Sequence, residues 1–206
     1  MKPKTRKAIK QTFVIAAVLF SVFIVVSILS FENTSSQQFD VSRPSISEQV
    51  WEYKPTVEKY AKQFGVTQYV DVMLAMMMQE SGGRGNDPMQ SSESYCGERG
   101  CIDEPELSIK QGVYYFSQTI KQANGDLKLA IQSYNFGKGF IDYINDNSGK
   151  YTQKAAINFS QKMYNTSSNK SIYTCLRKEA KQYNACYGDI YYVRDVLKYR
   201  DVLAKE

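Results

Sequence analysis

The sequence predicts an all-α domain in residues 46–206, preceded by an N-terminal transmembrane helix. Within these residues, apolar side chains recur at intervals of three and four, which is the spacing of one helix face. Residues that start or stop helices, such as Pro55, Gly65 and Asp126, stand at the ends of these stretches. No long run alternates apolar and polar residues as a half-buried strand would, although residues 84–105 leave room for a small hairpin.

The N-terminal segment has the composition of a membrane anchor. Residues 1–10 contain five basic residues and no acid, and residues 11–31 form a stretch of 21 residues without any charge. At about 1.5 Å per residue, that stretch is long enough to cross a hydrocarbon core of about 30 Å. The basic residues favour a cytoplasmic tail in residues 1–10, so everything from residue 32 onward is expected to lie outside the membrane. A cleaved signal peptide is the alternative, but its apolar region is normally shorter and ends in a small-residue cleavage site.

Residues 32–45 are polar, have no apolar period and are expected to be a linker. The chain has 26 basic and 21 acidic residues, and five of the basic residues lie in the first ten positions. Residues 11–206 therefore carry no net charge, which argues against a nucleic-acid partner.

Seven helices are expected in the domain, each from its apolar spacing and its terminal residues. Pro55 suits the first turn of one helix, Asp126 suits the N-cap of another, and Asp189 suits the N-cap of the last. The expected helices cover residues 55–64, 67–80, 107–120, 127 to near 137, 138–144 and 152–164, and a last helix begins at 190 and includes 197.

The stretch from Val70 to Ser91 is the centre of this arrangement. Residues 70–78 are apolar apart from one aspartate, which indicates a helix buried on most sides. Glu80 follows in the last helical turn, on the same face as Met73, Met76 and Met77. The glycines at 82 and 83 then stop the helix.

This position disfavours the charged form of Glu80. Desolvation beside methionines and the negative end of the helix dipole both raise the pKa of a carboxyl group. A carboxylic acid that keeps its proton near neutral pH is suited to general acid catalysis. The alternative is that Glu80 extends into solvent beside a glycine-rich loop.

The chain has four cysteines and no histidine. Outside the membrane the cysteines are expected to form disulfides, and the short separations favour Cys96–Cys101 and Cys175–Cys186, although four cysteines allow three pairings. A four-cysteine zinc site fits the first separation but not the second. Without histidine, histidine-based triads and the common histidine-rich metal sites are excluded, and neither a metal nor a cofactor is expected.

Five stretches resemble the soluble lytic transglycosylase and goose-type lysozyme superfamily, and most closely its CwlT-type lysozyme-like domains of Gram-positive cell-wall hydrolases. They occur in order between residues 76 and 199 and are MMMQESGGRGNDPMQSSES, SIKQGVYYFSQTI, AIQSYNFGKGFIDY, AINFSQKMY and YGDIYYVRDVLKY. The resemblance implies a lysozyme-like fold that cleaves peptidoglycan glycan strands. Members occur on conjugative elements, which suggests local wall opening for a conjugation or secretion complex.

The same resemblance assigns roles to individual residues. Glu80 would be the catalytic acid, and Ser81 would hydrogen-bond near the glutamate or the sugar. Met89 and Gln90 would line the cleft floor, while Tyr134 and Asn135 would face Glu80 and position N-acetylmuramic acid. From the residues alone, Tyr134 could equally be a core residue and Asn135 a helix C-terminal cap. The sequence departs from the family in two cysteine-containing insertions, in residues 95–107 and 165–186.

Hydrolysis by two carboxylates requires a second acid about 5–5.5 Å away for retention or about 6.5–9.5 Å away for inversion. Asp87 is the preferred candidate, with Glu93, Glu98, Asp103 and Asp142 as the others, and the sequence positions none of them. With Glu80 alone, the substrate's own groups could complete the reaction, as in a lytic transglycosylase that leaves a 1,6-anhydro sugar. A hydrolytic muramidase is ranked first, and a non-catalytic wall-binding scaffold with the same fold is the remaining alternative.

Overall fold

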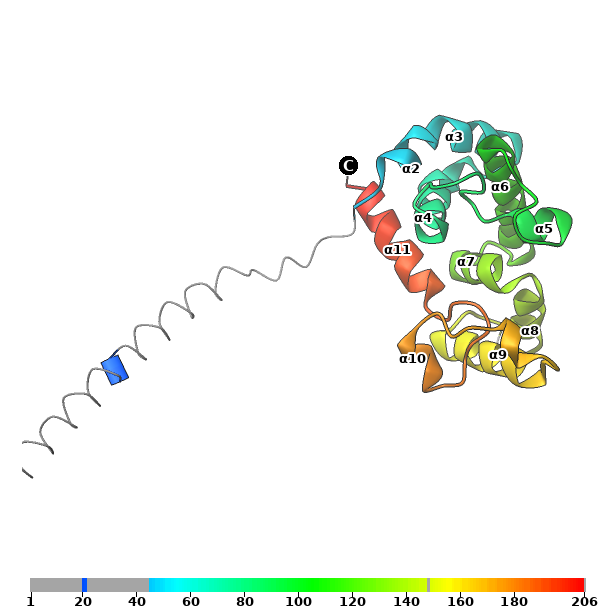
Figure 1. Ribbon diagram of the computed structural model, residues 1–206. Coiled ribbons are helices and arrows are strands. Elements are labelled where there is room, and N and C mark those ends of the chain that lie inside the picture. The colour runs from blue at the N-terminus through cyan, green and yellow to red at the C-terminus, as the bar shows by residue number, and fades with distance from the viewer. Residues whose placement is uncertain (1–19, 22–44, 148, 206) are drawn as a thin grey trace, which may run out of the picture. The chain divides into compact units, whose positions relative to one another are not determined.

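The computed structural model describes residues 20–21, 45–147 and 149–205, and it confirms the all-α class (Figure 1). No residue in these ranges belongs to a β-strand, so the small hairpin expected in residues 84–105 is wrong. The α-helices are α2 (Glu48–Glu52), α3 (Lys54–Gln63), α4 (Val70–Glu80), α5 (Ser92–Cys96), α6 (Pro105–Gln122), α7 (Leu127–Phe136), α8 (Gly139–Asn147), α9 (Gln153–Thr166), α10 (Lys178–Lys181) and α11 (Tyr192–Leu203), with short 3-10 helices at Thr67–Tyr69 and Lys170–Ile172.

Side-chain caps fix the starts of several helices. Asp126 accepts a hydrogen bond from the backbone N–H of Leu129 at 3.0 Å, as the sequence predicts for the start of α7. Thr152 caps α9 in the same way through the N–H of Ala155. These side chains satisfy backbone donors that have no partner inside the helix, which is why polar residues mark the boundaries.

Several expected boundaries differ from the structure by a few residues, among them those of α8 and α11. Helix α8 continues to Asn147, three residues beyond its expected end. The last helix begins at Tyr192 rather than directly after Asp189. The carboxylate of Asp189 instead accepts the N–H of Tyr191 at 2.9 Å and pairs with Arg177, so Asp189 shapes the turn before α11.

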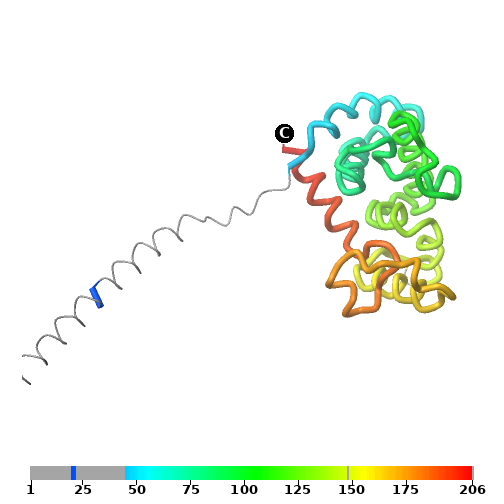
Figure 2. Tube along the Cα trace, in the orientation of Figure 1, coloured from blue at the N-terminus to red at the C-terminus, as the bar shows by residue number. Residues whose placement is uncertain are grey.

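Helix α4 is the centre of the domain because its apolar residues leave it almost no solvent-facing side. Six consecutive residues from Val72 to Met77 are buried. Helix α11 packs along α4, and α2 and α3 cover other parts of it. Helix α6 packs against α3 and α7, and the chain continues through α8 to α9 (Figure 2).

A cluster of aromatic rings joins α7, α8 and α9. The ring of Phe136 lies 5.3 Å from that of Phe140 and 5.5 Å from that of Phe159, between ring centroids. The ring of Tyr187 lies 5.7 Å from Phe136, and its hydroxyl donates to the carbonyl oxygen of Phe136 at 2.9 Å. Edge-to-face and tilted ring contacts of this kind favour a fixed geometry, so this end of α7 is held on several sides.

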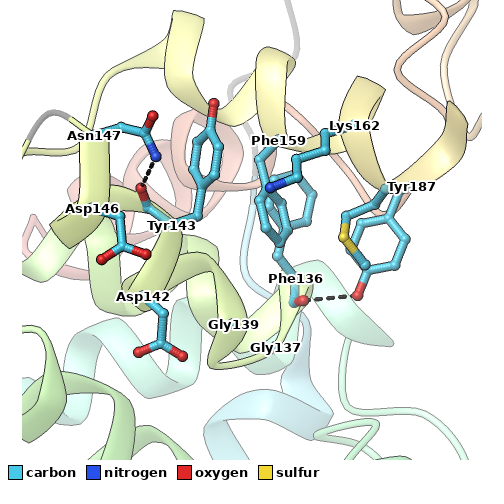
Figure 3. Close-up of a pocket in the computed structure, with 11 residues that line it drawn as sticks. Phe136, Gly137, Gly139, Asp142, Tyr143, Asp146, Asn147, Phe159, Lys162 and Tyr187 are labelled. Carbon is cyan, nitrogen blue, oxygen red and sulfur yellow. Dashed lines mark hydrogen bonds between the residues drawn. The ribbon is translucent and has the colours of Figure 1, made fainter. Parts of the chain in front are cut away.

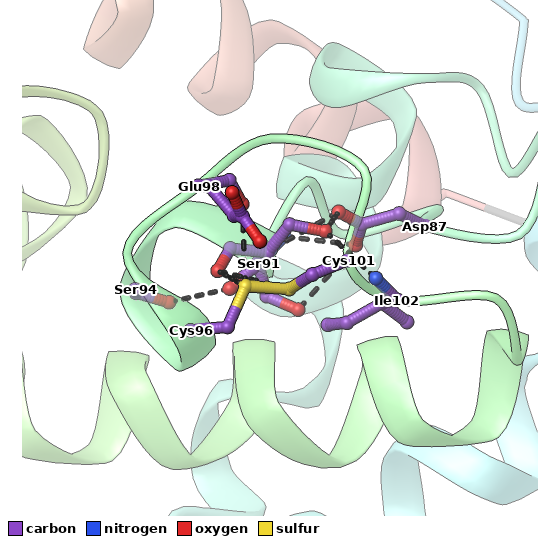
Figure 4. Close-up of a disulfide and its surroundings, with 8 residues drawn as sticks. Asp87, Ser91, Ser94, Cys96, Glu98, Cys101 and Ile102 are labelled. Atoms are coloured by element: carbon purple, nitrogen blue, oxygen red, sulfur yellow. Dashed lines mark hydrogen bonds between the residues drawn. A yellow bond between two sulfur atoms is a disulfide. The ribbon is translucent and has the colours of Figure 1, made fainter.

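Both expected disulfides are confirmed. Cys96–Cys101 joins the end of α5 to the segment that leads into α6 (Figure 4). Cys175–Cys186 closes the second insertion around α10. All four cysteines are therefore occupied as disulfides rather than as zinc ligands.

The expected cytoplasmic tail, the transmembrane segment 11–31 and the linker 32–45 lie outside the described residues, apart from Phe20, Ser21 and Ser45. Among the residues that are described, no helix combines the length and the apolar character needed to cross a membrane.

Candidate active site

Glu80 is the last residue of α4, and the backbone beyond it turns sharply. Gly82 and Gly83 have φ angles of 66° and 80°, which side-chain-bearing residues rarely adopt. A Cβ atom on Gly83 would lie 2.9 Å from the Cβ atom of Gln49. Ser47 also donates to the carbonyl oxygen of Gly82 at 2.6 Å. The start of α2 thus holds the end of α4, and Glu80, in a fixed place.

The Glu80 carboxyl group is paired with a buried tyrosine. The hydroxyl of Tyr192, in the first turn of α11, donates to Oε1 of Glu80 at 2.7 Å. Burial raises the pKa of Glu80 to about 7, although the Tyr192 hydrogen bond acts in the opposite direction. The negative charges of Asp87 and Asp189 add to the rise. Glu80 therefore exchanges a proton near neutral pH, as its sequence position suggested.

Tyr134, on α7, interacts electrostatically with Glu80. Its hydroxyl donates to the carbonyl oxygen of Met89 at 2.8 Å. Burial raises the pKa of Tyr134 and of Tyr192 well above the ordinary value, and the charge of Glu80 adds to both shifts. Both phenols therefore remain protonated and act as hydrogen-bond donors. The contact requires Gly112 on α6, because a Cβ atom there would lie 2.6 Å from the Cβ atom of Met89.

The loop after Glu80 is closed by its own side chains. The Ser81 hydroxyl donates to the carbonyl oxygen of Pro88 at 2.8 Å and accepts from the N–H of Gly83 at 3.0 Å. Met89 is buried, and its N–H donates to the hydroxyl of Ser108. Ser81 and Met89 thus hold the loop, while the side chain of Gln90 is exposed.

Asp87 organises the segment between this loop and α5. Its carboxylate accepts the backbone N–H groups of Ser91 and Ser92 at 2.9 and 3.0 Å. It also accepts the hydroxyl groups of Ser92 and Ser108, each at 2.6 Å. Partial burial acts to raise the pKa of Asp87, but these hydrogen bonds outweigh it and lower the pKa. Asp87 therefore stays charged, with both oxygens occupied (Figure 4).

A groove of about 250 Å³ collects several of the predicted residues. Gln90, Tyr134 and Asn135 line it together with Glu93 and Ser94 of α5. The remaining lining residues are Tyr115, Phe136, Gly137 and Tyr187. The disulfide-linked segment around α5 thus forms one wall of the groove, and the end of α7 forms the other.

Asn135 is held by the turn that precedes α11. Its Oδ1 atom accepts the backbone N–H of Asp189 at 2.7 Å. The side chain of Gln132, one turn earlier on α7, donates to the carbonyl oxygen of Asp189 at 2.9 Å. Helix α7 ends at a C-cap on Gly137, so the asparagine is not the terminal cap.

The other candidate carboxylates lie in different surroundings. Glu93 lines the groove and pairs with Arg99 at 2.9 Å. Glu98 and Asp103 are exposed on the segment between α5 and α6. Asp142 lies on α8, in a second cavity. None of these four contributes to the pKa shift of Glu80, whereas Asp87 does.

Sequence reasoning missed Tyr192, which contacts Glu80 from the far end of the chain. A signal was present, since Tyr192 lies four residues before the buried Val196 and so shares the inner face of its helix. Sequence reasoning also missed Arg177, which donates to both Asp189 and Asp195 from within the second insertion. Nothing in the spacing of these residues indicates that contact.

Comparison with known proteins identifies the family. The family model described as lysozyme-like matches residues 47–200. The bifunctional muramidase/DL-endopeptidase CwlT of Bacillus subtilis (strain 168) is 44% identical over 144 residues, which are 67% of this chain and 44% of that protein. The uncharacterized membrane protein YocA of the same strain is 40% identical over 155 residues, covering 73% of this chain and 68% of that protein.

A solved structure agrees with this result. It is an NLP/P60-family lipoprotein-like protein of Staphylococcus aureus, with 36% sequence identity and a TM-score of 0.66, and the match covers 76% of this chain and 54% of that chain. The chain therefore spans about half the length of CwlT and of the staphylococcal protein. From the family match and these identities, the chain belongs to the lysozyme-like family.

Proposed function

We propose that the chain is a peptidoglycan glycosidase that cleaves the bond between N-acetylmuramic acid and N-acetylglucosamine, with Glu80 as the general acid. One observation carries this proposal. Glu80 has a pKa of about 7 and interacts electrostatically with Tyr134, which lines a groove with Gln90 and Asn135. The name of the relative CwlT, a muramidase, supports the same reaction.

In this mechanism, Glu80 donates its proton to the glycosidic oxygen as the bond breaks. A pKa of about 7 keeps a large fraction of the carboxyl group protonated at neutral pH. Tyr134 offers an aromatic surface and Asn135 an amide to the N-acetylmuramic acid residue, and Gln90 contacts the strand from the opposite wall. Ser81 and Met89 hold the loop that positions Gln90.

We assign Asp87 a positioning role rather than that of a second catalytic carboxylate. Each of its two carboxylate oxygens already accepts two strong hydrogen bonds, so no lone pair is left to activate a water molecule. Asp87 would instead hold α5 against the groove and keep Glu80 protonated through its negative charge. Hydrolysis then requires a water molecule that is oriented by the substrate and the groove.

A lytic transglycosylase is the second candidate, and the occupied carboxylates favour it. Asp87 and Asp189 are the two carboxylates whose charges reach Glu80, and both are engaged by other groups. A reaction that uses Glu80 alone would let the 6-hydroxyl group of N-acetylmuramic acid attack its own anomeric carbon. Hydrolysis stays first because the relative CwlT is named a muramidase.

Mass spectrometry of the products distinguishes these candidates. The protein is incubated with purified Gram-positive peptidoglycan, and the released muropeptides are analysed. Reducing N-acetylmuramic acid ends are the result expected for a muramidase, and 1,6-anhydro ends identify a lytic transglycosylase. Wall binding without any released glycan would instead support a non-catalytic scaffold of the same fold.

We also propose that residues 11–31 anchor the chain in the cell membrane with residues 46–206 on the outer side, for local wall opening in conjugation or secretion. The uncharged stretch and the basic residues before it support this arrangement, as does a relative named as a membrane protein. Cell fractionation with external protease treatment tests it. The full chain should pellet with membranes and lose the domain to protease, and a chain without residues 2–31 should not pellet.

A further inference from the structure

A second and larger cavity, of about 500 Å³, lies between α8 and α9 (Figure 3). We call it the α8–α9 cavity. Phe136, Gly137 and Tyr187 line both this cavity and the groove beside Tyr134. The two spaces therefore lie next to each other at the end of α7, separated by these three residues.

The floor of the cavity is aromatic and fixed. The ring of Phe159 lies 5.5 Å from that of Phe136 and 5.2 Å from that of Tyr143, between centroids. The Tyr187 hydroxyl is hydrogen-bonded to the backbone of α7. Such a floor offers a rigid apolar surface to the methylene groups of a ligand without being remodelled on binding.

The α8 wall of the cavity carries two negative charges, and the α9 wall carries one positive charge. Asp142 and Asp146 lie one turn apart on α8, and both side chains are exposed (Figure 3). In the described part of the chain, neither of them forms a salt bridge. Lys162 of α9 is the cation on the opposite wall, with Nζ 5.6 Å from the centroid of the Tyr143 ring. Two like charges at this helix spacing repel each other, and a bound cation would relieve that repulsion.

We propose that the α8–α9 cavity binds the peptide stem of peptidoglycan through an amino group on the stem. The ammonium group would lie between Asp142 and Asp146, the aliphatic part of the side chain on the aromatic floor, and a stem carboxylate near Lys162. A neutral sugar could donate hydroxyl groups to the two carboxylates but would leave their charge uncompensated, whereas a diamino acid satisfies the floor and both walls. This inference rests on the proposed function, because the stem is attached to the N-acetylmuramic acid residue that the groove would hold.

Binding to insoluble peptidoglycan tests the proposal without requiring catalysis. The full-length Glu80→Gln chain, in detergent, is compared with the same chain carrying Asp142→Asn and Asp146→Asn. The probes are peptidoglycan freed of teichoic acid and the same material with its amino groups acetylated. We expect the double substitution to weaken binding to the native polymer about three- to tenfold, the effect of losing one or two partly exposed ion pairs. It should leave binding to the acetylated polymer unchanged.

The matched control removes the same charge from another part of the domain. Glu52→Gln with Glu58→Gln replaces two exposed carboxylates on α2 and α3, and it should not change binding to either polymer. Equal binding of the aspartate variant and its parent to native peptidoglycan would overturn the proposal. So would equal binding of the parent to native and acetylated material.

A third probe identifies the source of the amino group. Glycan strands freed of their peptide stems by an amidase should bind the parent and the aspartate variant equally. A difference that persists on these strands would place the amino group on the sugar and would contradict the stem assignment. If the wild-type chain releases no glycan, the proposed glycosidase function fails. The binding comparison still decides whether the α8–α9 cavity binds the peptide stem.

Discussion

Glu80 owes its chemistry to its position rather than to its residue type. An exposed glutamate is ionised at neutral pH, but this carboxyl group ends a buried helix beside the buried Tyr192 and near the negative charges of Asp87 and Asp189. Burial is the largest of these effects, and it acts against the charged form. The same property has consequences for stability and for the pH range of activity.

The stability of the fold should depend on the proton of Glu80. The unfolded chain loses this proton near pH 4.5 and the folded chain near pH 7. The contribution of the proton to the free energy of unfolding is therefore fully present below pH 4.5 and is lost as the pH rises through 7. We expect the free energy of unfolding of the wild type, minus that of Glu80→Gln, to fall by about 3 kcal/mol between about pH 4 and about pH 8. Urea unfolding of both proteins across this range measures the difference. A difference that does not change with pH would show that the pKa of Glu80 is not raised.

Tyr192→Phe should shift the alkaline limit of activity upward. The hydroxyl of Tyr192 stabilises the charged form of Glu80, so its removal raises the pKa of Glu80 further. A pH–rate profile of glycan release should therefore extend to higher pH than that of the wild type. Tyr114→Phe, an exposed tyrosine on α6, is the control and should leave the profile unchanged. A downward shift in Tyr192→Phe would contradict the assigned hydrogen bond.

At the scale of elements, the groove depends on contacts between segments that are far apart in the sequence. Helix α5 has only five residues and is held by the Asp87 carboxylate and by the Cys96–Cys101 disulfide. Tyr134 of α7 reaches the loop after α4 through the space that Gly112 of α6 leaves. Substitutions at Asp87 and Gly112 should therefore affect the site although neither residue contacts the substrate in the proposed mechanism.

Asp87→Asn should reduce activity and shift its pH profile. Loss of the charged hydrogen bonds to Ser91, Ser92 and Ser108 loosens α5, and a displacement of about 1 Å at a catalytic site can cost about 100-fold in rate. Removal of the negative charge also lowers the pKa of Glu80, so the alkaline limit should move to lower pH. Glycan-release rates across the pH range measure both effects. An upward shift of the limit would contradict the electrostatic role of Asp87.

Gly112→Ala should destabilise the fold and displace Tyr134. The added Cβ atom would lie 2.6 Å from the Cβ atom of Met89 and 2.8 Å from the hydroxyl oxygen of Tyr134, so one of them must move. Overpacking of this kind costs about 1–3 kcal/mol in the free energy of unfolding. Gly139→Ala, at the start of α8 with open space around it, is the matched stability control and should change that free energy little. Equal stability of the two variants would show that the site around Gly112 adapts freely.

At the scale of the whole molecule, the sequence predicts the long helices well and the short ones poorly. Helices α3, α4, α6, α7 and α9 follow from apolar spacing and caps, because each has ten or more residues over which a pattern can repeat. Helices α2, α5 and α10 have five residues or fewer, too short for periodicity to be visible. Their positions are set by tertiary contacts such as the Asp87 hydrogen bonds and the Cys175–Cys186 disulfide.

In the site too, features set by local sequence are predictable and features set by tertiary contacts are not. The unusual place of Glu80 is visible in the sequence because it depends on its own helix and the two glycines that follow. The spacing to Val196 places Tyr192 on the inner face of its helix, but no local pattern indicates that its partner is Glu80, 112 positions away. The hydrogen bond from Ser108 to Asp87 is equally hidden, because Ser108 lies on α6, 21 positions further along the chain.

The most direct test of the central claim compares glycan release by the wild type and Glu80→Gln. Both proteins are first shown to be folded by circular dichroism and thermal unfolding, and reducing or anhydro ends released from purified peptidoglycan are then counted over time. We predict that Glu80→Gln releases them at least about 100-fold more slowly, the loss typical of a missing general acid, while both proteins remain folded at the pH of the assay. Release by Glu80→Gln at the wild-type rate would show that another group protonates the glycosidic bond.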